Sequence, residues 1–257
     1  ALHLTQAAVS ARIKLLEATL GGRLFDRFKR DIRLTPEGNR LLRHADLLIS
    51  GWRKARQEVS AGNANLQLSF GGSLRLWDVL LQDWLQQLRS QRPTLAVIAE
   101  SATPDVLTRR LLDGVLDLAF MLEPSQIDVL NVQQVATIRL AMVSSRPDLH
   151  VGEALGDGYL MVDWGLAHAV THRRLFPDAP EPLTRLSTAR MAASYLLALG
   201  GSAYLPLHLV EPEIAVGRMH PVQGAPAIEY PAYAVYPARG PRAELIAQIL
   251  PMTQDVT

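Results

Sequence analysis

The chain has 257 residues and is close to neutral, with 26 Lys and Arg against 25 Asp and Glu. It has no cysteine, which excludes disulfides and thiol chemistry. No apolar run reaches the roughly 18 residues of a membrane helix, and no secretory pattern opens the sequence. We therefore expect a cytoplasmic protein with no membrane partner, long enough for a small module and a two-lobed domain.

Charge is unevenly distributed along the sequence. Residues 1–62 hold 12 basic and 6 acidic side chains, whereas residues 63–257 hold 14 and 19. A net positive segment attracts polyanions, so the amino-terminal part is the candidate for contact with nucleic acid.

The first predicted element is a short helix that follows Thr5, a good N-cap residue, and stops at Gly21 and Gly22. One face carries an apolar stripe at helical spacing: Val9, Ile13, Leu16 and Leu20. The opposite face carries small or basic side chains that permit close approach to a base edge: Ala7, Ser10, Ala11 and Lys14. Taken alone, this pattern also fits an ordinary amphipathic surface helix.

A basic segment, residues 23–34, follows and predicts two short strands that turn between Phe28 and Asp31. Lys29 and Arg30 at the tip are placed to meet phosphate oxygens, which fix position but carry no sequence information. A solvated run of charges is the alternative interpretation.

These two segments together resemble the winged helix-turn-helix of the LysR-type transcriptional regulators. The matches in register are Leu4-Thr5-Gln6, Ala8-Val9-Ser10, Ile13, Leu16-Glu17, Leu20-Gly21, Leu24-Phe25, Arg27, Leu34-Thr35 and Gly38. The resemblance implies a regulator that binds double-stranded promoter DNA in a sequence-specific way as a homodimer or homotetramer. It places the DNA contacts at Thr5, Gln6, Ala7, Ser10, Lys14, Lys29 and Arg30.

Two departures from the family pattern stand out. The residue after Ser10 is commonly Arg in the family and is Ala11 here, and Arg12 lies about 100° further round the helix. The family also has about two helices upstream of this one, whereas the sequence as given starts four residues before it, so we expect a fragment or a miscalled start. As written, the apolar stripe cannot be buried in the usual way.

The alternative function is a solute-binding or dimerisation module that has lost DNA binding.

Thr35, Pro36 and Glu37 open a long helix, since they suit the cap, the first helical position and the positive helix end. Its apolar residues recur with a 3.5-residue period, typical of a coiled-coil seam: Leu41, Ala45, Leu48, Trp52, Ala55 and Val59. The seam pairs either with a second copy or with its own domain.

We assign residues 1–35 to a partial DNA-binding domain, 36–62 to a linker and dimerisation helix, and 63–257 to an effector domain.

From Leu66 onward, strands and helices alternate, which predicts a parallel sheet. Expected strands are 66–70, 95–100 and 116–122, expected helices are 74–88 and 104–113, and Gly71-Gly72-Ser73 is an expected turn. Residues 111–119, 198–206 and 233–237 resemble the LysR-type effector domain. The implied fold is α/β: a partial winged helix-turn-helix plus linker helix, then two lobes like a periplasmic binding protein. Lobe I covers about 66–137 and 238–257, and lobe II about 138–237.

A small-molecule effector is expected in the cleft between the lobes. Hydroxyls after the first two strands lie beside helix amides, a geometry that favours a carboxylate, although the same residues serve equally as plain N-caps. The candidate effector-binding residues are Ser73, Ser101, Thr103, Glu123, Trp164 and Ser202.

The sequence gives no support for an enzyme or a cofactor. Ser73 and Ser202 each follow two glycines but lack the trailing glycine of a nucleophile elbow. His168 and His172 have the spacing of a helical metal pair, but no third ligand accompanies them, so no metal site is assigned. The run Val162-Asp163-Trp164-Gly165 is similar to the H-NS-dependent flagellar regulator branch of the family.

Overall fold

The computed structural model describes residues 5–28, 31–59 and 67–256. The chain forms two compact units, residues 1–64 and 65–257, and each is described by itself. The wing residues Lys29 and Arg30 lie outside the described residues.

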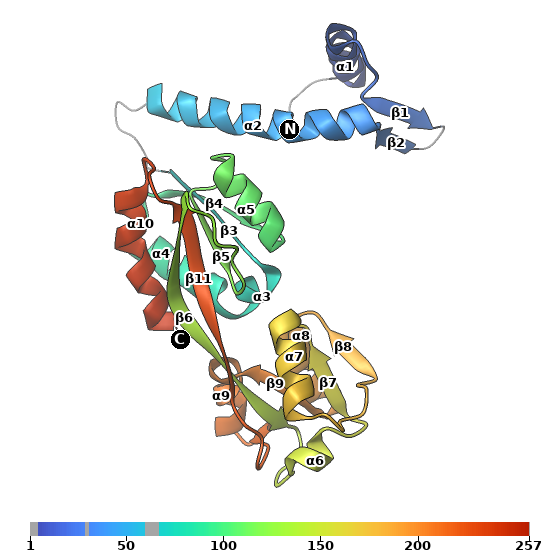
Figure 1. Cartoon of the computed structure of the whole chain (residues 1–257), viewed down its shortest axis with the longest axis vertical. Coiled ribbons are helices and arrows are strands. Elements are labelled where there is room, and N and C mark those ends of the chain that lie inside the picture. The colour runs from blue at the N-terminus through green and yellow to red at the C-terminus, as the bar shows by residue number, and fades with distance from the viewer. Residues whose placement is uncertain (1–4, 29–30, 60–66, 257) are drawn as a thin grey trace. The chain divides into compact units, whose positions relative to one another are not determined.

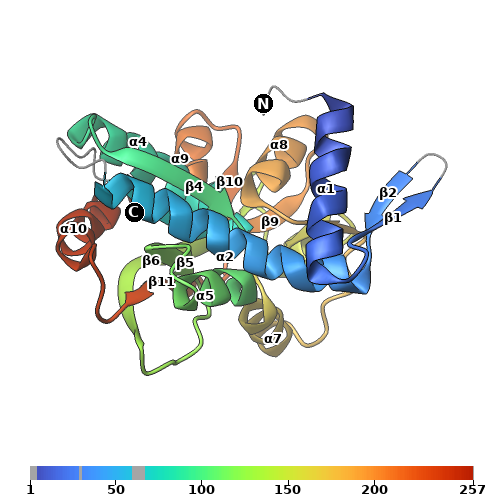
Figure 2. The ribbon, with the colours of Figure 1, turned by 90° about the horizontal axis from the view of Figure 1, so that it is seen from above.

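Unit one contains the helix α1 (Gln6–Leu20), the hairpin of β1 (Phe25–Phe28) and β2 (Asp31–Leu34), and the helix α2 (Pro36–Val59). The hairpin register pairs Phe28 with Asp31, as predicted. Figure 2 shows it beside the end of α1 and the start of α2. The predicted caps form: Thr5 Oγ1 accepts a hydrogen bond from the amide of Ala8 at 3.3 Å, and Gly21 ends α1 in the left-handed conformation at φ 70°.

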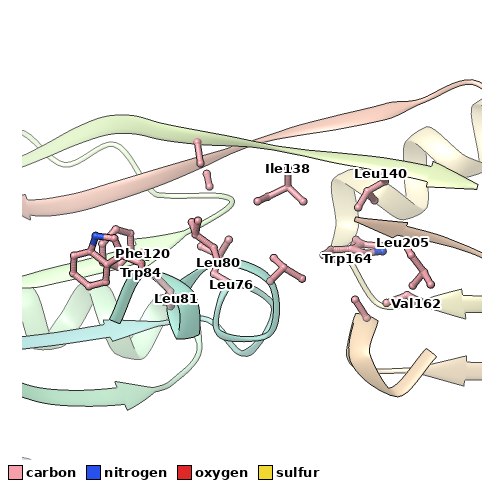
Figure 3. Close-up of a cluster of buried hydrophobic side chains, with 14 of the residues drawn as sticks. Leu76, Leu80, Leu81, Trp84, Phe120, Ile138, Leu140, Val162, Trp164 and Leu205 are labelled. Atoms are coloured by element: carbon pink, nitrogen blue, oxygen red, sulfur yellow. The ribbon is translucent and has the colours of Figure 1, made fainter. Parts of the chain in front are cut away.

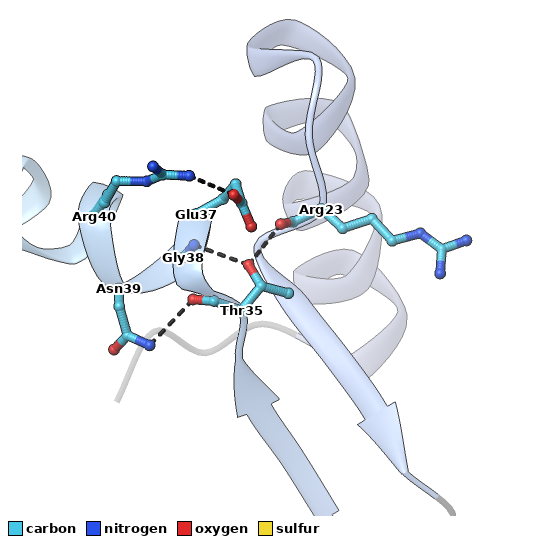
Figure 4. A network of polar contacts seen from close by, with 6 residues as sticks. All are labelled: Arg23, Thr35, Glu37, Gly38, Asn39 and Arg40. Carbon is cyan, nitrogen blue, oxygen red and sulfur yellow. Dashed lines mark hydrogen bonds and ion pairs between the residues drawn. The ribbon is translucent and has the colours of Figure 1, made fainter.

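The junction of α1, hairpin and α2 is held by residues that the family motif contains. Glu17 Oε1 accepts hydrogen bonds from the amides of Leu24 at 2.8 Å and Phe25 at 3.3 Å. Thr35 Oγ1 donates to the carbonyl of Arg23 at 2.7 Å and accepts from the amide of Gly38 at 3.0 Å (Figure 4). These side chains therefore set the geometry of the wing against the helix.

Unit two begins with parallel strands joined by helices. Its first part holds β3 (Gln67–Gly72), α3 (Leu74–Leu76), the π-helical turn η2 (Trp77–Leu81), α4 (Gln82–Gln91), β4 (Ala96–Ser101), α5 (Pro104–Leu112) and β5 (Leu118–Met121). Gly71 and Gly72, predicted as a turn, belong to β3. A Cβ on Gly72 would lie 2.1 Å from Leu81 Cδ1, and one on Gly71 2.5 Å from Leu107 Cδ2. The glycines are needed for this close helix–strand packing.

The remaining elements complete a mixed sheet. They are β6 (Leu130–Ser144), α6 (Val151–Ala154), β7 (Tyr159–Val162), α7 (Leu166–Leu175), β8 (Thr184–Leu186), α8 (Ala189–Leu199), β9 (Ser202–Pro206), α9 (Leu207–Ala215), β10 (His220–Pro221), β11 (Ile228–Pro237), α10 (Ala243–Ile249) and the 3₁₀ turn η3 (Leu250–Val256). The sheet order is β4-β3-β5-β11-β6-β9-β7-β8, with β10 pairing on β6.

The long antiparallel strands β6 and β11 run from one half of this unit to the other (Figure 1). We call the half with β3, β4, β5, α3, η2, α4, α5 and α10 lobe I, and the half with β7, β8, β9 and α6 to α9 lobe II. The expected boundary at 137/138 falls inside β6, and that at 237/238 falls at the end of β11. One buried apolar cluster follows the two strands, from Trp84 and Phe120 through Ile138 to Trp164 and Leu205 (Figure 3).

Candidate functional site

The first candidate site is the exposed face of α1. Gln6, Ala7 and Lys14 are exposed and Ser10 is half-buried, so these predicted contacts share a solvent-facing surface. The first turn contains only Gln6, Ala7 and Ala8, so no acidic side chain neutralises the positive helix end. The Thr5 hydroxyl is engaged as the cap. A helix end of this kind favours an anionic group such as a phosphate.

The apolar stripe of α1 is also solvent-facing in the described structure. Val9, Leu16 and Leu20 are exposed, and α1 has no buried residue. The seam of α2 is similar, because Leu48 is 72% exposed and Trp52 is exposed. The side chain of Val59 lies outside the described residues.

The second candidate site lies where the parallel strands of lobe I end. Gly72 pairs with Ser101 across β3 and β4, and β5 is the other neighbour of β3. Ser101 is the last residue of β4, and Ser73, Thr103 and Glu123 follow the carboxyl ends of β3, β4 and β5. This is the arrangement expected for a ligand edge. Ser73 is buried and its Oγ has no hydrogen-bond partner among the described residues. Thr103 precedes α5 without a side-chain cap bond, and Ser101 is exposed.

Four contacts join the lobes across this edge. Arg75 donates from Nε to the carbonyl of Asp163 at 2.6 Å and from Nη2 to its Oδ2 at 2.7 Å. Glu123 Oε1 accepts from the amide of Ala167, in the first turn of α7, at 3.2 Å. Asp78 Oδ2 accepts from the amide of Arg190, at the start of α8, at 3.0 Å. His208 Nε2 lies 2.9 Å from the carbonyl oxygen of Val79. We call these four contacts the interlobe clasp.

The clasp occupies helix amides of lobe II, whereas the sequence predicts an anion beside the helix amides of lobe I. Carboxylates of lobe I already satisfy first-turn amides of α7 and α8, which a ligand carboxylate would otherwise use. Burial raises the pKa of Asp163, but hydrogen bonds from Arg75 and the amide of Gly165 and the charge of Arg75 outweigh it, so the pKa of Asp163 is lowered. Asp163 therefore stays ionised and paired.

The run Val162–Gly165 carries much of this contact. Asp163 binds Arg75, and Trp164 is buried and donates from Nε1 to the carbonyl of Tyr204 at 3.4 Å. Gly165 adopts φ 101°, which favours glycine, and a Cβ there would lie 3.6 Å from Glu123 Oε1. The sequence analysis did not find the pairs Arg75–Asp163 and Asp78–Arg190. The two members of these pairs are 88 and 112 residues apart along the chain, so no local pattern connects them.

A pocket of about 330 Å³ lies between the lobes beside the clasp. Lobe I contributes Glu123 and lobe II contributes Trp164, so the structure brings these two predicted residues together. The pocket is lined by Leu122, Glu123, Pro124, Gln126, Val132, Trp164, Ala167, Tyr230, Pro231 and Tyr233. Ser202 is not brought to this site. Ser202 is the first residue of β9, whereas the residues that contact lobe I follow the ends of β7 and β9. The buried hydroxyl of Ser202 donates to the carbonyl of Ala154.

His168 and His172 are buried on α7, and their rings lie 5.9 Å apart. Burial lowers the pKa of His168 to about 4, assisted by His172 and opposed by Asp163. Burial also lowers the pKa of His172, with Arg185 adding to the effect.

No group of three or more metal-ligating side chains occurs in the described part of the chain. None of its helices is long and apolar enough to cross a membrane.

The comparisons with known proteins identify both units. Residues 1–39 match the model of bacterial regulatory helix-turn-helix proteins of the lysR family, and residues 62–256 match the LysR substrate binding domain. The HTH-type transcriptional regulator HdfR of Yersinia enterocolitica is 35% identical over 261 residues, covering 97% of this chain and 87% of that protein.

Solved structures show the same fold. A crystal structure of CbnR, a LysR family transcriptional regulator, has a TM-score of 0.72 at 16% identity, covering 98% of this chain and 91% of that one. DarR of Vibrio fischeri in complex with DNA has a TM-score of 0.59 at 22% identity, covering 97% and 90%. The chain belongs to the LysR family of bacterial helix-turn-helix regulators, and it is a DNA-binding transcriptional regulator with a substrate-binding domain rather than an enzyme.

Proposed function

We propose that the exposed face of α1 reads promoter DNA and that the hairpin tip, Lys29 and Arg30, contacts the phosphate backbone. The observation that carries this proposal is the solvent-facing surface formed by Gln6, Ala7, Ser10 and Lys14 at a helix end without acidic side chains. Small side chains at Ala7 and Ser10 allow a base edge to approach closely, and Lys14 supplies charge. The protein acts in the cytoplasm, where bacterial promoter DNA lies.

The DNA-binding test uses two substitutions on this face. Lys14→Ala should weaken binding with a cost of about 1 kcal/mol, nearly uniform across sequences, and lower the salt slope by about one if Lys14 contacts a phosphate. Ser10→Ala should instead change the preference at one base. Gel-shift and footprinting assays at several salt concentrations measure both effects.

Arg139→Ala is the matched control, because Arg139 is an exposed cation in the effector domain. It should leave affinity and salt slope unchanged. Wild-type footprint and affinity in both α1 variants would rule this face out, and would favour the alternative of a solute-binding or dimerisation module.

We propose that a small-molecule effector enters between the lobes, in the 330 Å³ pocket and along the hydroxyl edge of lobe I. Ser73, Ser101, Thr103, Glu123 and Trp164 are the contacts. The buried, unpartnered Ser73 Oγ supports this placement, because an unsatisfied hydroxyl costs free energy that a ligand acceptor would recover. Effector binding then acts on DNA through the interlobe clasp and the long helix α2, which pairs two copies along its exposed seam.

A further inference from the structure

A second pocket, of about 430 Å³, lies wholly within lobe II, between α7, β7 and residues 179–185. Its apolar wall includes Trp164, Phe176 and Pro180, and its polar lining includes His168 and His172. No lobe I residue lines it, and of its lining residues only Trp164 also lines the interlobe pocket. Its volume falls in the range of small-molecule sites, roughly 300–1,000 Å³.

The two imidazoles each present an unsatisfied nitrogen. His168 is 2% exposed and His172 is 6% exposed, and the Nε2 atom of each is buried without a hydrogen-bond partner among the described residues. Such an orphaned polar atom is unfavourable, because burial removes its hydrogen bonds to water without replacing them. Both histidines line the pocket, so a guest that enters it lies next to two buried rings whose polar atoms the protein alone does not satisfy.

The surrounding rings hold both imidazoles in place. Tyr159 stacks on His172 with ring centroids 5.4 Å apart, and Phe176 meets the same ring edge-on at 5.2 Å. The His168 ring is anchored by its Nδ1, which lies 3.1 Å from the Tyr230 hydroxyl. The lowered pKa of each imidazole keeps both rings neutral near pH 7, so they offer hydrogen bonds without positive charge.

The charge at the rim is unbalanced. Arg185 Nη2 lies 2.6 Å from Glu181 Oε2, and Arg173 Nη2 lies 3.7 Å from Glu181 Oε1, so two guanidinium groups share one exposed carboxylate. The other acidic residue of the pocket, Asp163, is engaged by Arg75. The rim therefore retains an excess positive charge that suits a carboxylate, which guanidinium groups bind with good geometry.

We propose that this lobe II pocket binds a small carboxylic acid with an apolar, ring-sized body. The carboxylate meets Arg173 and Arg185, the body packs between Trp164 and Phe176, and the ligand's polar edge reaches the imidazoles. The site lies within lobe II and shares Trp164 with the interlobe effector pocket. It borders the same Asp163–Gly165 turn that carries the clasp, so an occupant contacts the segment that joins the lobes.

The test titrates benzoate into the full-length chain carrying isotope-labelled histidine. Signals of His168 and His172 are assigned with the variants His168→Gln and His172→Gln. Benzoate should shift both signals saturably and raise the melting temperature. Arg185→Gln should weaken binding about tenfold, the loss expected for one charge-assisted contact. Benzamide, the uncharged isostere, should bind about tenfold more weakly than benzoate for the same reason.

Arg139→Gln is the matched control, since Arg139 is 61% exposed and Arg185 is 60% exposed. It should bind like the wild type, as should Ser101→Ala. Histidine signals that do not move at millimolar benzoate, or equal affinity in Arg185→Gln, would overturn the proposal. Binding that is lost in Ser101→Ala and kept in Arg185→Gln would place the acid between the lobes, supporting the effector proposal and contradicting this one.

Discussion

The Cβ atom that Gly38 lacks would lie 2.1 Å from the carbonyl oxygen of Leu24 and 2.9 Å from Leu34 Cδ2. This contact explains why a glycine follows Thr35 at that spacing: the start of α2 must touch the backbone at the start of the hairpin. The glycine of the family motif at this position is therefore required for close packing rather than for contact with DNA.

Gly38→Ala should therefore destabilise unit one by about 1–3 kcal/mol, because backbone rather than a flexible side chain stands in the way. Hydrogen exchange of the β1–β2 amides, measured by mass spectrometry, should accelerate. Gly51→Ala is the control: its Cβ would meet nothing within 4 Å, and replacing an exposed helical glycine should stabilise α2 by about 0.5–1 kcal/mol. Equal exchange rates in wild type and Gly38→Ala would contradict this account.

His168 predicts a pH dependence of stability. Its folded pKa is lowered from the ordinary 6.5 to about 4, so between these values the unfolded chain binds more protons than the folded one. Stability is then fully present above pH 6.5 and falls as the pH drops toward 4, by at most about 3 kcal/mol from this group. Urea unfolding at several pH values measures the slope.

His168→Gln keeps a polar side chain but removes this titration, so its stability should vary less between pH 6.5 and 4 than that of the wild type. A slope as steep as in the wild type would assign the pH dependence to another group.

At the scale of elements, α2 exposes an apolar seam at a 3.5-residue period, with Leu48 near its centre. An exposed stripe of this kind is stable in water when it faces a second helix. Leu48→Glu should abolish the dimer, because it would bury unpaired charges at the interface. Light scattering should show the monomer mass.

Arg40→Glu introduces the same side chain on α2 one position before the seam residue Leu41, about 100° round the helix. It should keep the dimer, although it loses its ion pair with Glu37. If Leu48→Glu retains the wild-type mass, the seam packs within one chain.

At the scale of the whole effector unit, the interlobe clasp holds the lobes together through polar contacts of modest strength. The Arg75–Asp163 pair joins a half-buried guanidinium to an exposed carboxylate, so a double-mutant cycle should give a coupling of about 0.5–1 kcal/mol. Contacts this weak allow a ligand to shift the balance between open and closed lobes.

Arg75→Gln should accelerate hydrogen exchange in the first turn of α7, where Glu123 accepts from Ala167, because separated lobes leave that amide to water. Arg218→Gln removes a pair with Glu213 inside lobe II and should leave this exchange unchanged. Unaltered exchange in Arg75→Gln would show that the other three contacts hold the lobes without it.

Several helix ends and the family could be predicted from short stretches of sequence, whereas the predicted turn at Gly71–Gly72 is part of β3. Thr5, Gly21, Thr35 and Pro36 mark helix ends by short-range chemistry, and apolar periodicity separates helices from strands, so these predictions needed no tertiary information. The motif matches also identified the two domain types that the comparisons found.

Which polar groups contact one another could not be predicted from the sequence, because the partners are far apart along the chain. Ser202 follows two glycines, a pattern that suggested a site residue, yet it is the first residue of β9 and its hydroxyl donates to the carbonyl of Ala154. Arg75 and Asp163 carry no local signal for each other, since 88 residues separate them. Side-chain partners across a cleft depend on how β6 and β11 bring the lobes together, and that geometry is a property of the folded sheet rather than of any sequence window.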